Sequence, residues 1–223
     1  MPHARPLTAV GAAALVVLAL AGCAGQADAG ATPSPTTTAT SAASAAAPTE
    51  TPTPGSTPTE SPAATVTIPD DCTQIVDTAT YQATMGETPL NPEGFGRRDV
   101  SPRGTRTPSV PAAGADPIGV AAAVTELDCL WRDPRADVTG LSVQMGRLDL
   151  PTGDSLLQQA EQGGARCSEA YDGRLCQKTT VDEMYGTDHT VTQFVRGDLM
   201  IVVSQSNFPT DDLLGSILEH LSS

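Results

Sequence analysis

Hydrophobic and polar positions follow regular patterns from residue 66 onward. The clearest helical pattern lies at the C-terminus, where apolar residues three and four positions apart would form one stripe on a helix. These residues are Leu213, Leu214, Ile217, Leu218 and Leu221. They follow Pro209 and two aspartates, which are typical of a helix start. The pattern predicts a closing amphipathic helix.

Period-two alternation predicts several strands. Leu141, Val143 and Met145 alternate with smaller or polar residues. Segments with strand patterns are 120–131, 138–148, 175–181, 190–196 and 199–205. Gly197 and Asp198 separate the last two by the length of a two-residue hairpin turn.

Two further helices are expected, one from residue 70 to Gly86 and one from Thr152 to Gly163, each starting beside an aspartate or threonine. Between the first helix and the first strand lies a long loop, residues 87–117, rich in Pro, Gly and Arg. The order of helix, hairpin, helix, strands and helix predicts an α+β fold. We expect an antiparallel sheet with helices packed largely on one face.

The first 22 residues have the pattern of an export signal. Residues 9–21 are an apolar run, shorter than the roughly 20 residues that span a bilayer. The run ends in Leu20-Ala21-Gly22-Cys23, which looks like a bacterial lipobox. The sequence therefore predicts a lipoprotein signal peptide over 1–22 and lipidation of Cys23. Cleavage at an A-x-A type site and an uncleaved signal anchor are the alternatives.

Residues 23–65 are dominated by Ala, Thr, Ser and Pro. Such a composition cannot bury a core and is typical of a disordered spacer. We expect a tether that follows the lipidated cysteine, and O-glycosylation of its threonines is an additional hypothesis. Residues 66–223 then form a single domain.

Charge and cysteine content narrow the class of protein and its compartment. The chain has 26 acidic and 12 basic residues, a net charge of -14, which excludes a protein that binds nucleic acid by neutralising phosphates. Besides Cys23, it has four cysteines, an even number that predicts two disulfides in an oxidising compartment. Cys167 and Cys176 flank a short loop and are the favoured pair, leaving Cys72 for Cys129. The two other pairings remain open.

Three short motifs resemble a known family. Cys72 opens a predicted helix that ends in Met85-Gly86, and Cys129-Leu130-Trp131 forms a C-x-W strand. In these features the chain resembles actinobacterial lipoproteins of unknown function with a Cys-helix-Gly and C-x-W pattern. The resemblance implies a fold similar to the extracytoplasmic sensor domains of some actinobacterial Ser/Thr kinases. It implies no catalytic residues.

Candidate catalytic groups are few. His220 lies in the last turn of the closing helix, and His189 follows Asp188 in a strand, where neighbouring side chains point to opposite faces. Asp182, Glu183 and Asp188 crowd one turn, which is more typical of a solvated turn than of a metal site. We therefore predict no catalytic residues, no metal and no cofactor.

The long loop carries the one basic cluster that we single out as a candidate site. Its members are Arg97, Arg98, Arg103 and Arg106. One interpretation is docking to anionic lipid, wall polymer or an acidic partner. The other is that these arginines locally balance the negative charge of the acidic domain.

Together these patterns predict a monomeric lipoprotein on the extracytoplasmic face of the cell membrane. We expect a non-catalytic module that binds an envelope ligand or partner and does not bind nucleic acid. The alternative is an accessory subunit that docks on a membrane protein or sensor kinase, and an envelope hydrolase is less favoured.

Overall fold

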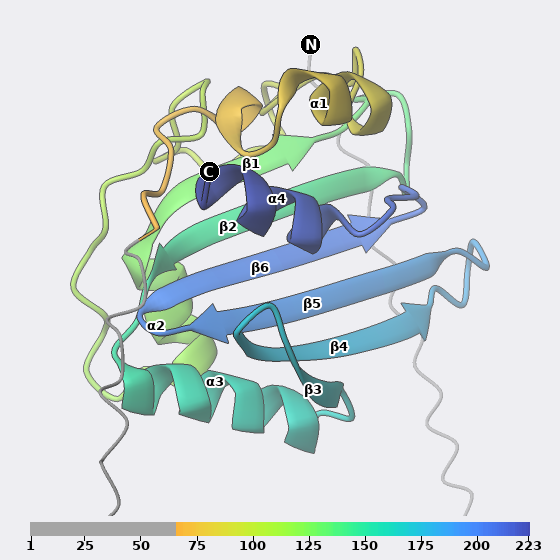
Figure 1. Cartoon of the computed structure of the whole chain (residues 1–223). Helices are drawn as coiled ribbons and strands as arrows, with labels where there is room; N and C mark the ends of the chain where they lie inside the picture. The colour runs from red at the N-terminus through yellow and green to blue at the C-terminus, as the bar shows by residue number, and fades with distance from the viewer. Residues whose placement is uncertain (1–65) are drawn as a thin grey trace, which may run out of the picture. The chain divides into compact units, whose positions relative to one another are not determined.

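The computed structural model describes residues 66–223. The predicted signal peptide, the lipidated Cys23 and the tether fall on residues 1–65 and lie outside the described residues. The described chain forms one antiparallel sheet with helices against it (Figure 1).

The sheet has six strands in the order β1-β2-β6-β5-β4-β3. They are β1 (Thr125–Trp131), β2 (Gly140–Arg147), β3 (Arg166–Ala170), β4 (Gly173–Val181), β5 (Asp188–Arg196) and β6 (Leu199–Ser206). Every neighbouring pair is antiparallel. The helices are the short 3₁₀ helix η1 (Cys72–Gln74), α1 (Thr78–Thr84), α2 (Pro117–Val124), α3 (Leu150–Gln162) and α4 (Leu213–Leu221). The predicted α+β class and antiparallel sheet are confirmed.

Helices cover both faces of the sheet because the central strands are apolar on both sides. Ile201 and Val203 of β6 face a core that includes α4 and the residues around η1. Met200 and Val195 face the opposite side, where they pack near α2 and α3. In Figure 1, α4 lies in front of the sheet and α2 behind it. The helices are thus divided between the two faces of the sheet more evenly than the sequence suggested.

The helix predicted from residue 70 to Gly86 is wrong as a single element. Asp71 caps η1 by accepting a hydrogen bond from the backbone N–H of Thr73, and Asp77 then caps α1. Two aspartates that bond their own backbone compete with one continuous helix. The break lets Ile75 and Val76 turn into the core, where they are buried.

The strand predicted over 120–131 begins later than expected. Its first part belongs to α2, which starts with Asp116 as N-cap and a proline in the first turn. Strand β3 was missed altogether, because Arg166, Ser168 and Glu169 interrupt any apolar alternation. Pairing with β4 holds this strand in place.

Both predicted disulfides are confirmed. Cys72–Cys129 links η1 to β1 and is buried in the core. Cys167–Cys176 joins directly opposed residues of β3 and β4. The first bond closes a long stretch of chain and the second a short one, so the first removes more freedom from the unfolded chain.

The long loop follows the outer edge of β1. Leu90 bridges to Trp131, and Thr105 bridges to Leu127. These bridges use backbone groups that an edge strand otherwise leaves open to other chains. Gly104 sits where the loop passes the first disulfide, at a φ of 97°.

Gly104→Ala should destabilise the domain by about 2–4 kcal/mol, because the positive φ strains any other residue and the added Cβ would collide with Cys72 Sγ. Gly114→Ala is the matched control, since its φ is also positive (75°) and nothing lies within 4 Å of the added Cβ. Urea unfolding of both variants measures the two costs. Equal losses would show that the contact with the disulfide is unimportant.

Candidate functional site

Three of the four loop arginines are paired with carboxylates. Arg103 Nη1 lies 2.6 Å from Asp71 Oδ2, and Arg106 Nε lies 2.6 Å from Asp99 Oδ2. Arg97 Nε is 3.6 Å from Asp99 Oδ1 and 3.9 Å from Asp128 Oδ2. The fourth residue, Arg98, is exposed.

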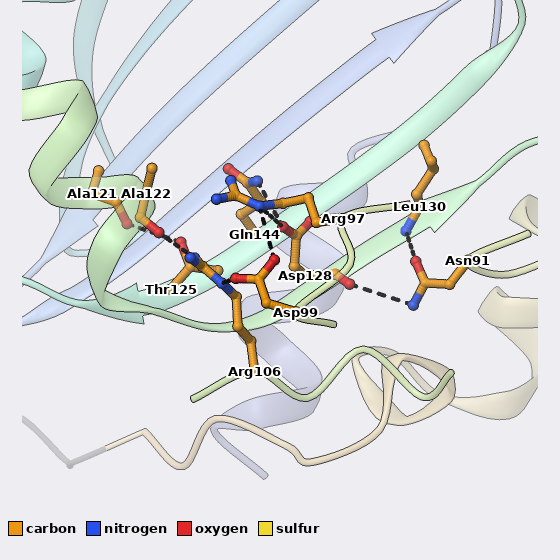
Figure 2. Close-up of polar contacts among 10 residues, drawn as sticks. All are labelled: Asn91, Arg97, Asp99, Arg106, Ala121, Ala122, Thr125, Asp128, Leu130 and Gln144. Carbon is orange, nitrogen blue, oxygen red and sulfur yellow. Dashed lines mark hydrogen bonds and ion pairs between the residues drawn. The ribbon is translucent and has the colours of Figure 1, made fainter. Parts of the chain in front are cut away.

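Arg106 ties the loop to the sheet and to α2. Its side chain is only 6% exposed, and its guanidinium donates to the carbonyl oxygen of Ala122 as well as to Asp99. Figure 2 shows this side chain reaching from the loop across to Ala122. A buried guanidinium that meets a carboxylate and a helix-end carbonyl acts as a structural clamp.

Asp128 is the buried carboxylate of this cluster. It lies on β1, is 8% exposed and accepts a hydrogen bond of 3.1 Å from Gln144 Nε2 on β2 (Figure 2). Burial raises the pKa of Asp128, and the hydrogen bond from Gln144 and the charge of Arg97 oppose that rise. Desolvation therefore outweighs the favourable contacts of this group.

Asn91 completes the junction between loop and strand. Its side-chain oxygen accepts a hydrogen bond from the backbone N–H of Leu130 at 2.9 Å. Its backbone N–H donates to the carbonyl of Leu130 at 2.7 Å. Asn91 thereby occupies the place of a paired strand residue at this edge (Figure 2).

These contacts change the interpretation of the basic cluster. Arg97 and Arg106 meet Asp99 and Asp128, so the formal charges of these four residues cancel. Arg103 is paired as well, although its side chain is 75% exposed. The cluster therefore fixes the loop on the sheet, and Arg98 and Arg103 are its outward-facing members.

Asp128→Asn should gain stability relative to the unmodified chain as pH rises from 3 to 7. Because the folded state raises the pKa of Asp128, its favourable contribution is present below the ordinary pKa and is lost as pH rises through the folded value. The variant removes that loss. Thermal unfolding at several pH values measures the difference.

Asp133→Asn is the control for the opposite sign. Hydrogen bonds from Arg135 lower the pKa of Asp133, so this carboxylate stabilises the fold above its ordinary pKa. The stability of the variant relative to the unmodified chain should therefore fall as pH rises. A falling curve for Asp128→Asn as well would contradict the desolvation argument.

A second candidate site lies on the same sheet face as Asp128. In register, Ser142 of β2 faces Ser204 of β6, which faces Val191 of β5. In the next row, Ser206 lies between Gly140 and His189. Helices α2 and α3 pack on the other end of this face, around Met200 and Val195, so these rows lie beyond the packed end.

A depression of about 310 Å³ occupies this part of the face. It is lined by Leu130, Arg132, Asp137, Val138, Gly140, Ser142, Asp182, Thr187, His189, Ser204 and Ser206. The lining combines hydroxyls, carboxylates, an imidazole and a guanidinium above a floor of strands. We call it the sheet depression.

His189 pairs with a serine across the sheet rather than with its neighbour Asp188. Its Nδ1 lies 2.6 Å from Ser206 Oγ. This is a hydrogen-bonding distance between an imidazole and a hydroxyl, and it places both groups at the rim of the sheet depression. His220 lies in the last turn of α4, as predicted.

Sequence reasoning considered His189 and Asp182 but missed the other residues of the sheet depression. Ser142, Ser204 and Ser206 belong to ordinary strand alternation, and Arg132 was not singled out. The available signal is that polar positions repeat at period two on two strands. That signal becomes a site only because β6 pairs with β2, a pairing that alternation cannot specify.

The acidic turn between β4 and β5 is closed by its own hydrogen bonds. Asp182 Oδ1 accepts from the N–H groups of Met184 and Tyr185, each at 2.9 Å. In the described part of the chain, no group of three or more His, Cys, Asp or Glu residues is arranged to hold a metal ion.

Comparison with protein families, with curated proteins and with solved structures gave no match. Within residues 66–223, none of the helices has the length and apolar content needed to cross a bilayer. The resemblance to actinobacterial lipoproteins therefore stays a prediction.

Proposed function

We propose that this protein is a lipoprotein held at the extracytoplasmic face of the cell membrane by Cys23. Its domain, residues 66–223, serves as a non-catalytic module that binds a ligand of the cell envelope. The segment over residues 23–65 acts as the tether between anchor and domain.

The observation that carries this proposal is the pair of disulfides. Thiols of cytosolic proteins are kept reduced, whereas exported proteins form stable disulfides. All four cysteines of the described domain are used in two bonds, Cys72–Cys129 and Cys167–Cys176. Of the five cysteines of the chain, Cys23 is the one that these two bonds do not use, and it follows the small residues of the lipobox.

The arrangement of the sheet supports a binding role. One end of a sheet face lies beyond α2 and α3 and carries a depression lined with hydrogen-bonding groups. Its lining comes mainly from paired strands, which are rigid supports for a binding site. Rigid placement lowers the entropic cost of ordering these side chains when a ligand binds.

Cys23→Ala should abolish incorporation of a labelled fatty acid and release the protein from the membrane fraction, because stable anchoring requires acyl chains. Metabolic labelling and fractionation measure both effects. The double variant Cys167→Ala/Cys176→Ala removes two other cysteines and should keep the label. Labelling that survives Cys23→Ala would overturn the lipoprotein proposal.

An accessory subunit is a second candidate, favoured by the tip of the β4–β5 hairpin. Three large apolar side chains are exposed there, Val181 (61%), Met184 (81%) and Tyr185 (50%). Apolar side chains grouped on a projecting turn are typical of contacts with another protein.

A photo-cross-linking residue placed at Met184 tests that alternative in the native envelope. If the tip docks on a membrane protein, Met184 should yield one discrete protein adduct by mass spectrometry. The control position is Val110 on the long loop, which is 92% exposed. Equal adducts from both positions would count against docking through the hairpin tip.

A further inference from the structure

We propose that the sheet depression binds a small, neutral, polyhydroxylated ligand, with the chemistry of a mono- or disaccharide. This inference rests on the proposed binding function and names the class of ligand at one site. It depends on four features of the described residues: the shape of the depression, its donors and acceptors, its charge and its rigidity.

The shape follows from side-chain size. Gly140, Ser142, Ser204 and Ser206 are small and lie in two adjoining rows of β2 and β6. Larger side chains surround them, with Leu130 on β1 and His189 on β5. Small residues between larger ones leave a hollow of about 310 Å³, at the lower end of the range for ligand sites.

The donors and acceptors suit hydroxyl groups. Serine and threonine hydroxyls both donate and accept, the carboxylates of Asp137 and Asp182 accept, and Arg132 donates. A sugar hydroxyl donates one hydrogen bond and accepts others, so one ligand of this class can satisfy such a mixed lining.

The charge and polarity of the lining disfavour anionic and apolar ligands. The lining has two carboxylates and one guanidinium, in a chain of net charge -14, and this disfavours a phosphate or another anion. An apolar ligand would bury the hydroxyls of Ser142 and Ser204 without partners, at a cost for each group. A neutral polar ligand avoids both penalties, and Leu130 and Val138 provide an apolar surface for its carbon atoms.

The guanidinium of Arg132 is held in place by the long loop and by the turn between β1 and β2. The guanidinium carbon of Arg132 lies 4.7 Å from the ring centroid of Phe95, and Nη2 donates to the carbonyls of Ala136 and Asp137. His189 is fixed by Ser206. The long loop therefore has a second role, because Phe95 positions a donor of the sheet depression.

Titration of free sugars into the full chain carrying Cys23→Ala tests the proposal by NMR. The probes are glucose, galactose, mannose, arabinose, N-acetylglucosamine and trehalose. At least one should bind saturably with a Kd on the order of 1 mM, as fits a small and polar site. The backbone amide signals of Ser142 and Ser204 should shift with the same Kd.

The double variant Ser142→Val/Ser204→Val should weaken this binding at least tenfold (about 1.4 kcal/mol or more), because valine fits a strand but cannot hydrogen-bond. The control is Thr179→Val/Thr190→Val, which removes two paired hydroxyls from the opposite sheet face and should leave Kd unchanged. If the serine double variant fails to fold, Ser204→Ala alone should still weaken binding several-fold.

Failure to bind any of the six probes would overturn the inference, as would equal binding by the serine variants and the unmodified chain. Binding of inorganic phosphate at the same amides would assign the depression to anions and equally contradict the proposal. Anchoring through Cys23 is measured separately, so the proposed lipoprotein function can stand while this ligand class is rejected.

Discussion

The pairing of β2 with β6 is the contact on which the rest of the domain depends. It runs from Gly140 opposite Ser206 to Arg147 opposite Leu199 and joins the β1–β2 hairpin to the strands that follow α3. Arg147 pairs with Asp198, and Leu148 N–H donates to the carbonyl of Asp198, so this junction is fixed at one end. A slip of one residue would exchange the two sheet faces, removing Ile201 and Val203 from the main core and the serines from the open face.

The second constraint is the exposed edge of β1. Antiparallel sheets with open edges recruit other chains, and here the long loop takes up that edge with isolated bridges and with Asn91. Arginine–carboxylate pairs then hold the loop, which explains why a basic cluster occurs in an acidic domain. The cost is the burial of Asp128, whose raised pKa records a carboxylate in a poorly solvated position.

Much of the fold could be predicted because its signals are local. The apolar stripe of α4, the alternation of β2 and the Gly197-Asp198 turn each occupy a short window, and all three are present. Prediction failed where local signals competed or were absent. Asp77 starts α1 as an element separate from η1, so one predicted helix became two. Asp116 and Pro117 turned the start of a predicted strand into α2, and β3 has no apolar alternation of its own. The arginine cluster was found, but its partners could not be.

The sequence by itself determined the α+β class, the antiparallel sheet and the presence of two disulfides, because periodicity and cysteine count need no tertiary structure. Among the three possible pairings, the structure selected the favoured one. Only the tertiary structure decided what the polar side chains do. Asp128 contacts Arg97 and Gln144, and Ser142 lies opposite Ser204, although these residues are separated in the chain. Such contacts depend on strand order, which long-range packing selects and which no local pattern specifies.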